Sequence, residues 1–236
     1  MNHTTLYDSL SLATKIMMDK IIYFFIFSLP LLGFSLLSGS KTQNFPTHLV
    51  IVIVLGASFV FLSCGVYGSL IDAIKDKKNS TSTFFAHGRK FFPSLLVYSL
   101  FLGFLFILIM LGLNFLNKLL VFIQLDKRSS ITLASTSISI LNIYVLPSLF
   151  YYNAAVGDAF SKGLSFFRKD IPTSLVLGLI LFFSPGIHML GIPVFVSRLV
   201  FAFVHLYVFL TAAGVIKKIA SRKQEALLPV PGTKHE

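Results

Sequence analysis

Four of the polar side chains within the long apolar stretches of this sequence are the first places where chemistry could occur. Arg198 and His205 fall in the last stretch, seven residues apart, so a helix would place them on a similar face. Asn142 and Asn114 fall in two earlier stretches and could hydrogen-bond across helices. Ionisable groups inside a bilayer are rare because hydrocarbon disfavours charge. These four residues are therefore the candidate intramembrane polar site.

The two ionisable residues of this set also have a structural interpretation. Arg198 lies close enough to one end of its stretch for the guanidinium to reach the headgroups and anchor the helix. His205 lies near the middle of the same stretch, where a lone histidine is more commonly a neutral hydrogen-bonding group than a proton relay. No aspartate or glutamate falls within the apolar stretches, which argues against a proton-driven transporter.

Two aspartates stand just beyond the ends of two apolar stretches. Asp72 and Asp158 occupy corresponding places in a pattern that recurs along the chain, so they could form a paired acidic site at the membrane surface. Local ion pairs with Lys75 and Lys162, three and four residues further on, are the favoured alternative because such spacings bring side chains together on a helix.

The remaining residues contain no recognisable catalytic or metal-binding motif. The single cysteine, Cys64, excludes an internal disulfide and a thiolate cluster. The other histidines are scattered along the chain, whereas a metal site needs clustered ligands. The nucleophile elbow, the zinc-protease helix and the phosphate-binding glycine loop are all absent. We expect neither enzymatic activity nor a cofactor.

The composition explains why these polar residues stand out. Of the 236 residues, 55% are hydrophobic and only 12% are charged, against about 25% charged in a soluble domain. We predict an all-α polytopic membrane protein, with one transmembrane domain over residues 1–220 and a disordered cytoplasmic tail over 221–236. Six stretches are long enough to cross about 30 Å of hydrocarbon: they cover residues 21–38, 48–71, 94–123, 131–152, 171–190 and 192–214.

The distribution of lysines and arginines predicts the orientation of these six helices in the membrane. They concentrate before the first stretch, between the second and third, between the fourth and fifth, and after the sixth. Short basic loops stay in the cytoplasm, so both termini should be cytoplasmic. The net charge of +11 then reflects topology and attraction to anionic membrane lipids, with no need for nucleic acid. The absence of tryptophan and the abundance of Phe and Lys fit a bacterial inner membrane.

The cytoplasmic segments resemble one another. Each combines a short amphipathic helix with a charged turn and a following apolar stretch, which predicts a three-fold repeat of interfacial helix plus transmembrane hairpin. Basic, Phe-containing loops are also common in unrelated membrane proteins, so the similarity could be compositional. The candidate lipid or partner contacts in the second and third copies are Phe84, Phe85, Arg89, Lys90, Phe160, Phe167, Arg168 and Lys169.

The same segments resemble a known family. The motifs are Gly65-x-Tyr67-Gly68 with Asp72-Ala73, then Phe84-Phe85 with Gly88-Arg89-Lys90-Phe91-Phe92, then Asp158-Ala159-Phe160-x-Lys162-x-Leu164-x-Phe166-Phe167-Arg168-Lys169. Over residues 5–220 the pattern resembles the bacterial six-helix membrane domain found fused to some glycerophosphodiester phosphodiesterases and in stand-alone membrane proteins. The resemblance implies an architecture. The phosphodiesterase activity of the fusions belongs to a separate soluble barrel, and this chain contains no such domain.

Two functions from different classes remain open. One is a non-catalytic accessory or scaffold protein that binds a partner membrane protein or lipid, which agrees with the lack of catalytic motifs and the basic, Phe-rich segments. The other is a transport component for a small molecule or lipid, with a path near Arg198, His205 and Asn142. An enzyme acting on lipid ranks below both.

Overall fold

The computed structural model describes residues 4–39, 45–78, 80–119, 127–186 and 193–225, and these parts of the chain are built from α-helices. The helices are α1 (Thr4–Asp19), α2 (Ile21–Gly39), α3 (Phe45–Ile74), α4 (Thr81–Leu119), α5 (Lys127–Tyr151), α6 (Val156–Lys169), α7 (Ile171–Gly186) and α8 (Val194–Glu225). The prediction of an all-α fold is confirmed.

Four of these helices contain stretches that are long and apolar enough to cross a membrane. These stretches are Leu49–Ile74 of α3, Thr81–Leu119 of α4, Ser129–Tyr151 of α5 and Phe195–Arg222 of α8. Within the described side chains, α2 and α7 contribute shorter apolar segments, Ile21–Pro30 and Ile171–Leu181. By length and composition, therefore, the helices are those of a multi-pass membrane protein.

Two helix boundaries differ from the predicted ones. A charged turn was expected between the second interfacial segment and the third apolar stretch, but α4 runs unbroken from Thr81 through Pro93. Pro93 removes only the hydrogen bond to the carbonyl four residues earlier, and membrane helices tolerate that loss. At the other end of the chain, α8 continues past Ser221, where the tail was predicted to begin, to Glu225. Residues 226–236 lie outside the described residues.

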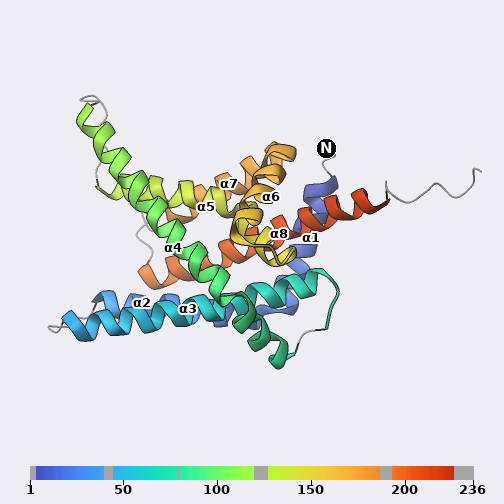
Figure 1. Ribbon diagram of the computed structural model, residues 1–236, viewed down its shortest axis with the longest axis horizontal. Coiled ribbons are helices and arrows are strands. Elements are labelled where there is room, and N and C mark those ends of the chain that lie inside the picture. Colours follow the sequence, from blue (N-terminus) through green and yellow to red (C-terminus); the bar gives the residue numbers. More distant parts are fainter. Residues whose placement is uncertain (1–3, 40–44, 79, 120–126, 187–192, 226–236) are drawn as a thin grey trace, which may run out of the picture.

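Most of the long helices lie along a common axis. In Figure 1, α2, α3, α5 and α8 run along the long axis of the molecule, while α4 crosses α3 obliquely and diverges from it. The start of α1, the end of α3 and the end of α8 lie toward one end, and the end of α2 and the start of α8 lie toward the other. The basic segments at the start of the chain, after α3 and at the end of α8 therefore gather at one end of the bundle.

Small residues allow the first part of α4 to lie directly on α3. A Cβ added at Gly65 would stand 2.5 Å from the ring of Phe84, and one at Gly68 would stand 2.4 Å from His87. Neither distance is compatible with an unshifted neighbour, so glycine is needed at both places. Gly103, further along α4, faces open space instead.

α6 and α1 also pack against a long helix at a glycine. A Cβ at Gly163 of α6 would lie 2.9 Å from backbone atoms of Val145 on α5. One at Gly214 of α8 would lie 3.3 Å from the side chain of Ser9 on α1. Each of α3, α5 and α8 therefore has an amphipathic partner helix in close contact.

Lysines bridge the C-terminal ends of the long helices. Lys75, just after α3, donates to the carbonyl of Tyr151 at the end of α5, with 2.6 Å between nitrogen and oxygen. Lys217 of α8 donates to the carbonyl of Ile74 (2.5 Å) and to the carboxylate of Asp76 (2.7 Å). A cation at this position stabilises a helix because the last carbonyls have no intrahelical partner.

Candidate functional site

A cavity of about 320 Å³ lies among α2, α3, α4, α5 and α8, inside the stretches that are apolar enough to span a membrane. Aromatic and aliphatic side chains form most of its wall. The polar groups on the wall come from Ser63, Tyr67, Tyr98, Ser99, Ser139, Asn142 and His205. Two of the four residues proposed as an intramembrane polar site, Asn142 and His205, are therefore brought together here.

His205 is held between aromatic rings and one hydroxyl. Its Nε2 lies 2.9 Å from the phenolic oxygen of Tyr67, so a hydrogen bond joins α8 to α3. Its ring stacks on Phe27, with centroids 6.0 Å apart and planes inclined by 5°, and on Phe201, also at 6.0 Å. The imidazole is thus oriented from three sides. In the part of the chain described, its polar contact is a neutral hydroxyl and not a carboxylate.

Asn142 makes the second cross-helix bond of the cavity. The Tyr98 hydroxyl of α4 donates to Oδ1 of Asn142 on α5. Asn142 had been expected to bond across helices, and it does. Its partner is Tyr98. Asn114, the other asparagine of the candidate polar site, is exposed on the far part of α4.

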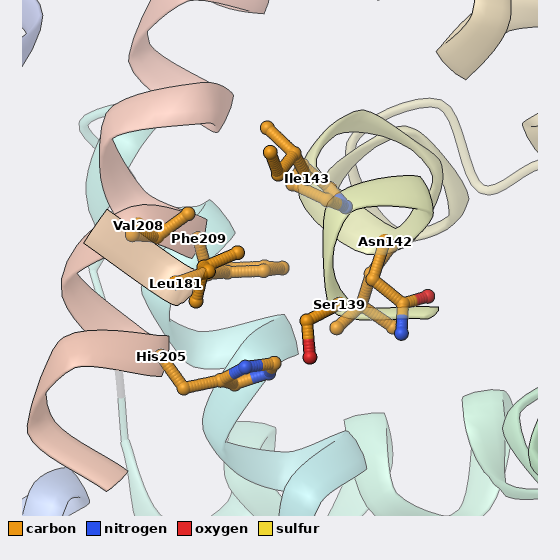
Figure 2. A pocket seen from close by; sticks show the side chains of 9 residues that line it. Ser139, Asn142, Ile143, Leu181, His205, Val208 and Phe209 are labelled. Atoms are coloured by element: carbon orange, nitrogen blue, oxygen red, sulfur yellow. The ribbon is translucent and has the colours of Figure 1, made fainter. Parts of the chain in front are cut away.

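Two serines place further hydroxyls at the wall. Ser139 donates to the carbonyl of Ser135 at 3.0 Å within its own helix, whereas the buried Ser63 hydroxyl has no hydrogen-bond partner among the described residues. A smaller cavity of about 10 Å³, with room for about one water molecule, adjoins the larger one. Figure 2 shows Ser139 and Asn142 from α5 facing this small cavity, with His205 opposite them on α8.

The other predicted residues of this site lie elsewhere. Arg198 is partly exposed near the start of α8, two turns before His205, and lines neither cavity. The sequence-based interpretation missed Tyr67 and Tyr98. The signal available was a tyrosine hydroxyl inside an apolar stretch, which needs a hydrogen-bond partner when buried.

The two aspartates proposed as a pair have separate surroundings. The carboxylate of Asp72 forms a hydrogen bond with Nε2 of His87, with 2.7 Å between the two atoms. The Asp72 side chain is only 15% exposed and the His87 side chain 19%. This His87 contact takes the place of the local ion pair with Lys75 that was favoured from spacing. Asp158 is exposed in the first turn of α6, where a negative charge favours the helix N-terminus.

Most aromatic members of the candidate interfacial contacts pack inward, and the basic members are exposed. Phe84 is buried against Gly65, while Phe85 is 50% exposed. Phe160 packs edge-on against Phe101, with centroids 5.3 Å apart, and Phe167 is partly buried beside α5 and α8. The basic members of the set are all exposed: Arg89, Lys90, Arg168 and Lys169.

Comparison with known proteins finds no relative of this chain. No protein-family model, no curated protein and no solved structure matches this chain. In the described residues, no three His, Cys, Asp or Glu side chains come close enough together to hold a metal ion. The cavity can therefore be interpreted only from its own chemistry: an apolar chamber with neutral hydrogen-bonding groups on opposite walls.

Proposed function

We propose that this chain is a non-catalytic membrane accessory protein that holds part of a lipid, or a similar amphiphile, in the cavity at His205 and Asn142. The observation that carries the proposal is the wall of that cavity. Its volume of about 320 Å³ lies at the lower end of the range for small-molecule sites, about 300–1,000 Å³. That space suits a segment of acyl chain with a hydroxyl or ester group, and the neutral polar pairs would orient that group.

The proposed topology has six spans, with both termini in the cytoplasm of a bacterial cell and the bundle in the inner membrane. The gathering of basic segments at one end of the bundle supports this orientation. α2 and α7 supply the two additional spans. The proposed resemblance to six-helix bacterial membrane domains rests on the sequence motifs of residues 65–73, 84–92 and 158–169.

The proposed three-fold repeat is supported by the contacts of the amphipathic helices. α1, the first part of α4, and α6 each pack against a long helix at a glycine, and two of the three long helices are capped by a lysine from a neighbour. The glycine contact is thus common to all three proposed units, and the lysine cap to two of them.

An accessory role also needs a surface for a partner, and α4 offers the most exposed one. Only 11% of its apolar window is buried within the chain, against 61% for that of α8. Lipid or a second membrane protein must cover the exposed side chains Phe104, Ile107, Leu111 and Phe115.

Transport is the second candidate function. It is favoured by the position of the cavity within the spans and by the presence of an ionisable side chain, His205, on its wall. The two functions differ in what becomes of the bound molecule: an accessory protein retains a lipid, whereas a transport component releases the small molecule or lipid that it moves.

A pair of serines allows a matched test. Ser139 lines both cavities, whereas Ser137 lines neither, yet both lie on α5 and both hydroxyls donate to the carbonyl four residues earlier. Ser139→Leu fills the cavity, and Ser137→Leu makes the same chemical change outside it. We expect native mass spectrometry of the protein purified in mild detergent to show a retained lipid in the wild type and in S137L, but not in S139L.

Two results would decide against this function. Equal lipid retention in both variants would show that the cavity is not the binding site. A retained water-soluble molecule that S139L loses, with no lipid, would favour transport.

A further inference from the structure

A second cavity, of about 280 Å³, opens at the end of the bundle where α3 and α5 finish. The first part of α4 forms its third side. Its wall includes the side chains of Lys75, Lys77, Lys90, His87 and Asp72. Unlike the wall of the intramembrane cavity, this wall carries three lysines.

The charges on this wall do not balance. Three lysines face one carboxylate, and that carboxylate, on Asp72, is already engaged by His87 at 2.7 Å. Lys75 uses one of its three N–H groups on the Tyr151 carbonyl. Burial, followed by the charges of Lys77 and Lys90, lowers the pKa of Lys75, and the charge of Asp72 offsets only part of this effect.

Aromatic rings form the inner side of the cavity. Phe91 and Phe150 line it and contact each other with ring centroids 4.6 Å apart. Phe150 in turn contacts Tyr67, on the wall of the intramembrane cavity, at 5.4 Å. The basic cavity therefore lies beyond an aromatic layer, at the level where the apolar stretches end and headgroups begin.

We infer that this basic cavity binds an anionic phosphate group, carried either by a lipid headgroup or by a soluble phosphate compound. Lys77 and Lys90 supply the mobile charges at the rim, and Lys75 supplies a fixed one inside. Ammonium groups bind phosphate as point charges, which requires no fixed geometry from the exposed lysines. The site is distinct from the intramembrane cavity and does not depend on the function proposed for it.

The neighbouring residues provide a matched control. Lys77→Gln with Lys90→Gln removes two charges from the rim, while Lys78→Gln with Arg89→Gln removes two charges from exposed positions next to them in sequence that do not line the cavity. Lys75 is left unchanged because it also caps α5. Melting temperatures of both variants, measured first, check that each is folded.

Binding is then measured with two kinds of probe at fixed ionic strength. Phosphatidylglycerol is compared with phosphatidylcholine in mixed micelles by native mass spectrometry, and inorganic phosphate is compared with chloride by calorimetry. We expect the rim variant to weaken binding of the anionic probe by about tenfold, and the control pair by less than about twofold.

The outcome identifies the source of the phosphate. If the rim variant selectively loses binding of phosphatidylglycerol, the site is assigned to a lipid headgroup. If it selectively loses binding of inorganic phosphate, the site is assigned to a soluble phosphate compound. Equal losses in both variants, or no preference for either anionic probe in the wild type, would overturn the inference. Ser139→Leu should leave phosphate binding unchanged, so failure of this site and failure of the intramembrane cavity can be told apart.

Discussion

Replacing Gly68 by alanine tests the contact on which both the α3–α4 packing and the Asp72–His87 pair depend. The new methyl group would lie 2.4 Å from Cγ and 2.6 Å from Cβ of His87, where ordinary contacts begin at 3.4 Å. Because His87 Cβ is attached directly to the α4 backbone, a change of rotamer cannot remove the clash. The first part of α4 must move away from α3 by about 1 Å.

The expected change in the free energy of unfolding of G68A is the sum of three contributions. Overpacking of a tight helix contact costs about 1–3 kcal/mol. The displacement also breaks the hydrogen bond between His87 and Asp72, which costs about 1–3 kcal/mol for a partly buried charged group. Alanine regains about 0.5–1 kcal/mol over glycine within a helix. The net expectation is a loss of about 3 kcal/mol in the free energy of unfolding.

The assay is unfolding in mixed micelles with increasing sodium dodecyl sulfate, followed by far-ultraviolet circular dichroism because the chain has no tryptophan. Gly103→Ala is the control, since a Cβ there meets nothing within 4 Å, and its stability should stay within about 1 kcal/mol of the wild type. If G68A were as stable as G103A, α4 could not lie on α3 as described.

Two further predictions follow from single contacts. Gly163→Ala places a methyl group 2.9 Å from the α5 backbone, which cannot swing aside, so we expect a loss of about 1–3 kcal/mol in the same assay. The hydrogen bond from Lys217, with its charge, holds the pKa of the Asp76 carboxyl below its usual range. The stabilisation that Asp76 provides is therefore complete above its unfolded pKa and lost as pH falls through the folded pKa. The melting temperature of D76N should be lower than that of the wild type at pH 6, and the difference should shrink as the pH falls below the usual range of an aspartate carboxyl.

The sequence predicted the helices well because apolar runs of sufficient length leave few alternatives. α2 and α7 begin at Ile21 and Ile171, as expected, and the amphipathic α6 was expected from Phe160 and Phe167 with the basic residues beside them. The continuity of α4 was missed because a charged turn was expected just before the apolar stretch 94–123, at Pro93. Proline is compatible with the first turn of a helix and, in membrane helices, with the interior, so residue type alone could not decide.

The polar contacts could be predicted only in part. Spacing along one helix favoured Lys75 as the partner of Asp72, yet Asp72 lies one turn after Gly68, on the face that lacks a side chain and admits α4. The same glycine that brings α4 close thus brings His87 to Asp72. The bond between Tyr98 and Asn142 likewise depends on where α4 crosses α5. Contacts of this kind arise from tertiary packing, which a periodic pattern in one chain does not contain.

The packing of α1, the first part of α4 and α6 also changes where the proposed repeating unit would begin. The first part of α4 and α6 each follow the long helix on which they pack, whereas α1 precedes every long helix and packs on the last one, α8. α1 therefore takes the place that a helix after α8 would occupy. Tyr207 of α8 reaches Thr14 of α1 at 3.1 Å, and Lys218 pairs with Asp8, so first and last helices are bonded at two levels. If the proposed unit is a long helix plus the shorter helix that follows it, with α1 serving as the partner of α8, then all three helix pairs lie within units. If the proposed unit instead begins with the shorter helix, each shorter helix packs against the long helix of a neighbouring unit.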